Sequence, residues 1–252
     1  MTAEVKTELV AGILTVTLAR PDKKNALTNE MYGAIADAIE GASAGNVRVI
    51  LVQGEGDSFT AGNDLGEFAA QAAGSGPAKR HVERLIHALA NTNVPVVAAV
   101  QGKAVGVGTT MLLHCDYVLL SEDAQLITPF VNLALVPEAA STYLLPLRIG
   151  HARAFEMFAF GAPVSATNAL AWGIANRVVP NAELRSEARR IAEMIAAKPS
   201  GSVTAMKQLM RDVARLVSQI DAERAIFSQR LQSAEAREAF AAFAEKRTPK
   251  FH

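Results

Sequence analysis

The sequence contains a single cysteine, no net charge, few aromatic residues and no long apolar run. Cys115 is alone among 252 residues, which excludes an internal disulfide and suits a reducing compartment. Twenty-five Lys and Arg balance 25 Asp and Glu, so no overall field attracts nucleic acid or an anionic membrane. The longest apolar run, residues 94–100, is far shorter than the about 20 residues of a membrane-spanning helix. We therefore expect a cytoplasmic globular protein that binds neither nucleic acid nor a membrane.

Half of the residues are apolar, and their spacing separates the chain into two parts. Strand patterns occur at residues 13–18, 47–52, 94–100 and 117–120, and helical spacing occurs at 28–39 and 79–90. This alternation predicts an α/β fold with some parallel strand pairing. Beyond residue 148 the pattern is helical, apart from a candidate strand at 176–179. The helices expected there are 166–172, 184–197, 203–217 and 222–246.

Two loops carry glycines and small residues in patterns that turn main-chain N–H groups outward. Residues 58–65 read S-F-T-A-G-N-D-L, where Gly62 and Asn63 tolerate positive φ and allow a concave turn. Residues 98–110 read A-A-V-Q-G-K-A-V-G-V-G-T-T, where a buried strand leads through a glycine-spaced turn into a helix N-terminus. This second loop matches neither a phosphate loop nor the dinucleotide fingerprint. Each loop alone is a weak functional signal.

Together the loops resemble the signatures of the crotonase family, the enoyl-CoA hydratase/isomerase superfamily. Residues 59–65 are similar to its F-x-A-G-x-D-[IL] segment. Residues 100–116 are similar to its V-N-G-x-A-x-G-G-G-x-x-L-x-x-x-C-D segment, with Gln101 for Asn and Val107 for the middle Gly. Residues 20–27 resemble its R-P-x-x-x-N-A-L motif. The resemblance covers essentially the whole chain. It implies a spiral core of ββα units over residues 1–180 and a helical C-terminal part, 181–252, that builds a homotrimer or a dimer of trimers.

The resemblance also assigns roles to two main-chain amides. In the family, the residue after the Ala-Gly pair and one at the helix start donate N–H groups to the thioester oxygen; here these are Asn63 and Val107. Removing a proton beside a thioester moves negative charge onto that oxygen, and one preorganised donor is worth roughly 3–4 kcal/mol. The implied substrate is an acyl-CoA thioester, so coenzyme A belongs to the substrate and no separate cofactor is expected.

Hydratases of this family carry two glutamates, at positions that here hold Thr110 and Phe130. Neither side chain exchanges a proton near neutral pH, which argues against ordinary hydration. Residues 128–146 read T-P-F-V-N-L-A-L-V-P-E-A-A-S-T-Y-L-L-P and resemble the T-P-F-x-x-L-G-x-x-P-E-G-x-S-S-Y-x-x-P stretch of peroxisomal-type Δ3,Δ2-enoyl-CoA isomerases. The glutamate of that stretch is the catalytic base, and here it is Glu138. Its apolar flanks predict desolvation and a raised pKa.

Other residues are assigned by position with simpler alternatives beside them. Lys23 and Lys24, and Lys246, Arg247 and Lys250 of the tail, are candidates for the CoA phosphates, or else are solvated surface charges. Ala26, Ala61, Asp64, Leu65, Thr110 and Phe130 are expected to bind the substrate, with Asp64 and Leu65 shaping the side that receives the CoA adenine. The five histidines show no metal-ligand spacing, so no metal is expected. His114 is interpreted as a core or interface group.

The favoured function is isomerisation of 3-enoyl-CoA to trans-2-enoyl-CoA, with Glu138 moving the proton. Two alternatives stay open: an enoyl-CoA hydratase in which another carboxylate, such as Glu67, enters the pocket, and a family member that only binds acyl-CoA. Acyl chain length and pathway do not follow from the sequence.

Overall fold

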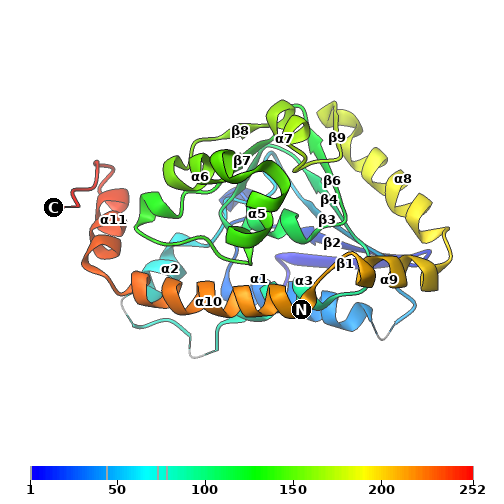
Figure 1. Ribbon diagram of the computed structural model, residues 1–252, viewed down its shortest axis with the longest axis horizontal. Coiled ribbons are helices and arrows are strands. Elements are labelled where there is room, and N and C mark those ends of the chain that lie inside the picture. Colours follow the sequence, from blue (N-terminus) through cyan, green and yellow to red (C-terminus); the bar gives the residue numbers. More distant parts are fainter. Residues whose placement is uncertain (1, 44, 73, 78, 252) are drawn as a thin grey trace.

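A twisted sheet with helices on both faces forms the centre of the computed structural model, which describes residues 2–43, 45–72, 74–77 and 79–251 (Figure 1). The strands are β1 (Val5–Val10), β2 (Ile13–Leu18), β3 (Val49–Gly54), β4 (Val96–Val100), β5 (Lys103–Val105), β6 (Tyr117–Ser121), β7 (Gln125–Ile127), β8 (Val164–Ser165) and β9 (Arg177–Val179). The helices are α1 (Asn29–Ala42), α2 (Leu65–Ala72), α3 (His81–Asn91), α4 (Val107–Thr110), α5 (Ser141–Ile149), α6 (His151–Phe160), α7 (Ala166–Trp172), α8 (Leu184–Ala196), α9 (Ser200–Leu209), α10 (Val213–Leu231) and α11 (Ala234–Ala244). Short 3-10 helices are η1 (Pro21–Lys23), η2 (Met111–His114), η3 (Val131–Leu133) and η4 (Asn181–Glu183).

The strands form two sheets, and most of the pairing in the larger one is parallel. That sheet has the order β1-β2-β3-β4-β6-β9, with β1 antiparallel to β2 and the other neighbours parallel. The order β5-β7-β8 makes the smaller sheet. The predicted α/β class and the candidate strand at 176–179 are therefore confirmed. β1 was not predicted, because the charged residues of its sequence hide the alternation.

Both faces of the larger sheet are covered, which explains its nearly continuous apolar strands. Alternate residues point to opposite faces. Along β3, Ile50 and Val52 belong to the core that includes α1 and α3, whereas Val49 and Leu51 pack against α8. The central parallel strands are therefore apolar at most positions on both faces.

The predicted helix caps are present where the sequence places them. The Thr28 side chain accepts a hydrogen bond from the Met31 amide at the start of α1, and Ser165 caps α7, which ends at Gly173. The C-terminal helices differ from their predicted bounds. The predicted helices 203–217 and 222–246 are wrong, because Asp212 and Ser233 cap new helices at Val213 and Ala234.

The C-terminal helices lie along the molecule rather than apart from it. α8 packs on β2, β3, β4 and β6, and α10 contacts α3 and α5. In Figure 1 α10 runs along one edge of the molecule beside α2 and α3, and α11 closes the end that carries the C-terminus. The boundary at residue 180 stays a prediction.

Candidate active site

The two glycine-bearing loops lie side by side and in parallel register. The amide of Thr60 donates to Lys103 O at 3.0 Å, and the amide of Val105 donates to Thr60 O at 3.0 Å. The bridge between the loops joins Thr60 and Ala104, which precede Asn63 and Val107 by three residues each. Within the described part of the chain, neither the Asn63 amide nor the Val107 amide donates to a protein acceptor. Val107 is buried and Asn63 is partly buried, so a bond from either amide to a ligand stays a prediction.

The close approach of the loops requires glycine at two positions. Gly62 has φ +86°, and a Cβ there would lie 2.8 Å from Val105 O. A Cβ on Gly108 would lie 2.4 Å from Cγ2 of Thr60. Any side chain at either position pushes the loops apart. The glycines of the two motifs thus set the separation of the two amides.

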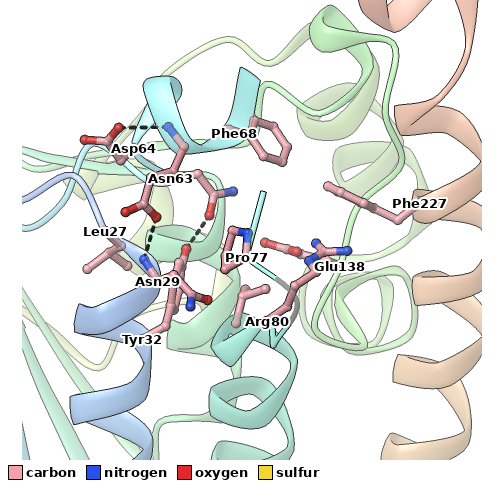
Figure 2. Close-up of a pocket in the computed structure, with 12 residues that line it drawn as sticks. Leu27, Asn29, Tyr32, Asn63, Asp64, Phe68, Pro77, Arg80, Glu138 and Phe227 are labelled. Carbon is pink, nitrogen blue, oxygen red and sulfur yellow. Dashed lines mark hydrogen bonds between the residues drawn. The ribbon is translucent and has the colours of Figure 1, made fainter. Parts of the chain in front are cut away.

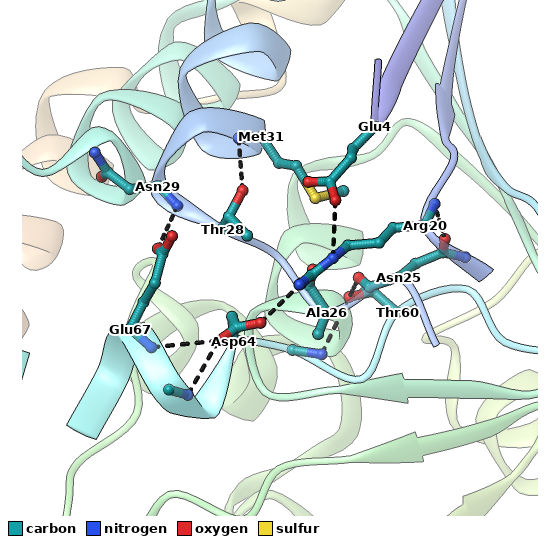
Figure 3. A network of polar contacts seen from close by, with 12 residues as sticks. Glu4, Arg20, Asn25, Ala26, Thr28, Asn29, Met31, Thr60, Asp64 and Glu67 are labelled. Atoms are coloured by element: carbon teal, nitrogen blue, oxygen red, sulfur yellow. Dashed lines mark hydrogen bonds and ion pairs between the residues drawn. The ribbon is translucent and has the colours of Figure 1, made fainter. Parts of the chain in front are cut away.

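The N-terminal motif is hydrogen-bonded to the first loop (Figure 3). The buried Asn25 side chain donates to Ser58 O and Glu55 O, both at 2.8 Å, and accepts the Arg20 amide. Thr60 Oγ1 in turn donates to Asn25 O at 2.6 Å. The motif at residues 20–27 therefore fixes the backbone of the first loop through these hydrogen bonds.

A cavity of about 50 Å³ brings Asn63 and Glu138 together (Figure 2). It lies between α1, α2, α3 and α10, and Val107 is outside its lining. The aromatic or apolar side chains of the lining are Leu27, Tyr32, Phe68, Pro77, Val82 and Phe227. The charged ones are Asp64, Glu67, Arg80 and Glu138. The site thus joins a loop with a free amide to a buried carboxyl group.

Glu138 is a buried carboxyl group of this cavity. Only 9% of its surface is exposed, and its Oε1 has no hydrogen-bond partner in the described structure. Burial raises the pKa of Glu138 to about 7, the negative charge of Glu223 adds to the rise, and Arg80 opposes it. A carboxyl group with this pKa exchanges protons readily near neutral pH.

Tyr32 is a site residue that the sequence analysis missed. Its hydroxyl donates to Asn63 Oδ1 at 2.5 Å and so fixes the Asn63 side chain. Burial, and then the charge of Glu138, raise the pKa of Tyr32 well above its ordinary value, so the hydroxyl keeps its proton. Arg80, Phe68 and Phe227 were also missed. None of the four belongs to a local motif that signals a binding site.

The positions that hold glutamate in hydratases are filled by groups without acid–base function. Thr110 is fully buried and its hydroxyl faces Val107 O at 3.5 Å. Phe130 packs with Leu135 and Phe227, and it is not part of the cavity lining. Its predicted contact with substrate stays a prediction.

The remaining predicted binding residues lie in the N-terminal motif (Ala26) and in the first loop (Ala61, Asp64 and Leu65). Asp64 accepts Arg20 Nη1 at 2.8 Å and two amides at the start of α2. These bonds lower its pKa against the opposing effect of burial, which is the largest single influence. Leu65 and Ala61 are exposed, and Ala26 O accepts Arg20 Nη1 at 3.0 Å. The contacts of all four residues with substrate stay predictions.

The candidate phosphate-binding cations differ in their surroundings. Lys23 is exposed, whereas Lys24 Nζ lies 2.5 Å from Asp57 Oδ2. In the tail, Arg247 pairs with Glu238 and Glu245. Contacts of these residues, and of Lys246 and Lys250, with CoA stay predictions. Among the residues described, no helix has the length and apolarity to cross a membrane, and no group of three or more His, Cys, Asp or Glu gathers to hold a metal.

The fold and the paired loops define the class of protein to which the chain belongs. Residues 8–252 match the enoyl-CoA hydratase/isomerase family. The chain is a member of that family, and its fold is the crotonase fold, as the motifs predicted. The crystal structure of an enoyl-CoA hydratase/isomerase from Pseudoalteromonas atlantica T6c superposes with a TM-score of 0.94 at 40% identity, covering 99% of this chain and 100% of that one.

Curated relatives carry different activities in their names. The chain is 32% identical to the 1,2-epoxyphenylacetyl-CoA isomerase of Escherichia coli K12, over 95% of each chain. It is 35% identical to enoyl-CoA delta isomerase 2 of Rattus norvegicus over 79% of this chain, which spans 52% of the rat protein. The family is therefore established as one of enzymes that act on acyl-CoA thioesters, while the particular reaction is a separate question.

Proposed function

We propose that the protein is a Δ3,Δ2-enoyl-CoA isomerase in which Glu138 is the single proton-transferring group. The observation that carries the proposal is the buried carboxyl of Glu138, which lines the same cavity as Asn63 and whose Oε1 has no hydrogen-bond partner in the described structure. Thr110 and Phe130 stand where a hydratase carries its pair of glutamates. A 1,3-proton shift requires one group that acts first as base and then as acid, and this site supplies such a group.

The proposed reaction begins with an ionised Glu138 and a 3-enoyl thioester. Glu138 removes the proton from C2, and the electrons move onto the thioester oxygen to form a dienolate. The amides of Asn63 and Val107 donate to that oxygen as its charge develops. Glu138 then returns the proton to C4, the double bond becomes C2=C3, and the carboxylate is regenerated. No water or external cofactor enters the balance.

The test compares two substrates and one variant. The purified protein should isomerise 3-hexenoyl-CoA rapidly and hydrate crotonyl-CoA feebly. Glu138→Gln keeps the size of the side chain but removes the base, so isomerisation should fall by roughly 10²–10⁴-fold. Glu30→Gln is the control: it neutralises an exposed carboxylate on α1 that does not line the cavity, so this variant should retain activity. Full activity in Glu138→Gln would overturn the assignment of the base.

Hydration is the second candidate, and one observation favours it. Glu67 and Asp64 line the same cavity as Glu138, so three carboxylates face one space. Glu67 Oε2 accepts the Asn29 amide at 2.6 Å, which ties it to the start of α1. If crotonyl-CoA hydration exceeds isomerisation and is lost in Glu67→Gln, the protein is a hydratase. If acyl-CoA binds but neither reaction proceeds, the protein is a binding member of the family.

We also propose that the chain assembles as a homotrimer or a dimer of trimers. Large apolar side chains of α5, α6 and α9 face outward, with exposed fractions of 67% at Leu147, 66% at Phe160 and 89% at Leu209. An assembly that covers them supports solubility. Sedimentation equilibrium measures the mass directly, and a monomer at micromolar concentration would exclude this proposal.

A further inference from the structure

The segment that carries Glu138 has an unusual backbone. The two residues that follow Glu138 are alanines with positive φ, +66° at Ala139 and +53° at Ala140. L-residues other than Gly, Asn and Asp rarely adopt this region, because Cβ crowds the following carbonyl. Both alanines are buried. Such a turn persists only where its surroundings hold it, so the contacts on it decide where the Glu138 carboxyl points.

The contact on one side of the turn comes from a histidine. His114 Nε2 lies 2.8 Å from Ala139 O, and its Nδ1 lies 3.2 Å from Arg211 Nη2. A guanidinium only donates, so Nδ1 must accept and Nε2 must carry the proton that is donated to Ala139 O. The ring is buried, and burial together with the neighbouring cations lowers the pKa of His114 to about 3. The ring is thus neutral and has a single tautomer.

The contact on the other side comes from α10. Glu223 accepts the Thr142 amide at 2.9 Å and also accepts a hydrogen bond from the Thr142 hydroxyl. The turn is therefore held at the carbonyl of Ala139 and, just after it, at the amide of Thr142. Of the two contacts, only the one from His114 is linked through the chain to Val107. His114 ends η2, and η2 directly follows α4, which begins at Val107.

We propose that His114, held by Arg211, is a positioning residue that fixes the Glu138 carboxyl relative to the oxyanion amides. The imidazole is a strut between the end of η2 and the carbonyl beside the base. Its hydrogen bond to Ala139 O offsets the conformational energy of the left-handed backbone at Ala139 and Ala140, and this backbone places Glu138 in the cavity lining. His114 touches no substrate. This inference rests on the proposed function only through the kinetic part of its test.

The kinetic test uses His114→Leu, which removes the donor. A carboxyl displaced by an ångström loses about 10²-fold in rate, so kcat for 3-hexenoyl-CoA should fall between about tenfold and that limit. KM should change by less than about threefold, because the groups that hold the acyl-CoA are untouched. Ala139→Gly in the same protein makes the left-handed turn accessible without the bond and should restore kcat several-fold.

The matched control is Ala11→Gly, in the β1–β2 turn. Ala11 also has positive φ, +52°, but it is exposed and belongs to the edge hairpin. If relief of backbone strain acts only through global stability, both glycine substitutions rescue His114→Leu equally, and the proposal is overturned. An unchanged kcat in folded His114→Leu overturns it too. Should His114→Leu not fold, Arg211→Met replaces it, with a smaller loss of kcat and the same selective rescue expected.

Two readouts do not depend on turnover. Imidazole ¹⁵N NMR should show His114 as the neutral Nε2–H form at pH values down to about 5; an Nδ1–H ring, or one that titrates near its ordinary value, contradicts the proposed strut. Hydrogen exchange of the peptide that spans residues 138–144 should accelerate in His114→Leu and slow again with Ala139→Gly. If the wild type fails to isomerise 3-hexenoyl-CoA while these readouts hold, the proposed function fails and the strut stands.

Discussion

Replacing Glu138 by Gln should make the protein more stable at alkaline pH while it removes the proposed catalytic base. In the folded state burial, with Glu223 nearby, raises the pKa of Glu138 from an ordinary 4.5 to about 7. The unfolded chain retains the ordinary value. Between these two values the folded state holds a proton that the unfolded state has lost. Stability therefore decreases as the pH rises through this window, and above it the folded protein carries the full cost of a buried charge.

The size of the effect follows from the two pKa values. Each unit of difference corresponds to about 1.4 kcal/mol. Integrated between about pH 5 and pH 8, the linkage relation makes the wild-type protein lose about 2–3 kcal/mol through this one carboxyl. Glutamine has no charge to bury, so Glu138→Gln should lose none of it. Glu223 is present in both proteins, and its own pH dependence largely cancels in the comparison.

Urea denaturation of both proteins at several pH values measures the difference. The free energy of unfolding of Glu138→Gln minus that of the wild type should grow by about 2–3 kcal/mol from about pH 5 to pH 8. Glu30→Gln, an exposed change on α1, should give a flat difference. A flat difference for Glu138→Gln would mean that the carboxyl is solvated in the folded state. The physical argument for its role as base would then be lost.

Three further predictions concern the two loops and their support. Val107→Pro removes one oxyanion donor at the first position of a helix, where proline is tolerated, so kcat should fall by about 10²–10³-fold with little change in Tm. Gly108→Ala places a methyl group 2.4 Å from Thr60 Cγ2 and should lower both stability and kcat; adding Thr60→Ser removes that methyl clash, keeps the hydroxyl and should recover part of each. Tyr32→Phe frees the Asn63 side chain and should cost about 1 kcal/mol in urea denaturation, with a several-fold change in kcat/KM. A Val107→Pro enzyme with wild-type kcat, a Thr60→Ser change without recovery, or a neutral Tyr32→Phe would each contradict the corresponding contact.

The motif residues could be predicted because local chain geometry demands them. Glycines at 62 and 108 are required by close approach, and the apolar flanks of Glu138 announce its burial. Tyr32, Glu223 and the partner of His114 could not be predicted, because their contacts join segments that are distant in sequence. The ends of α9 and α10 were missed for another reason. Asp212 and Ser233 compete with long stretches of good helix formers, and the helical periodicity continues across both breaks.

The influence of α10 on Glu138 means that this cavity can change in evolution without any change in the loop motifs. Glu223 shares no motif with the glycine loops, yet its negative charge helps to raise the pKa of Glu138, and Phe227, one turn further along α10, lines the same cavity. Substitutions along one face of this helix would retune the working pH and the shape of the acyl pocket while every signature residue stayed the same. Two chains with identical loops can therefore prefer different thioesters.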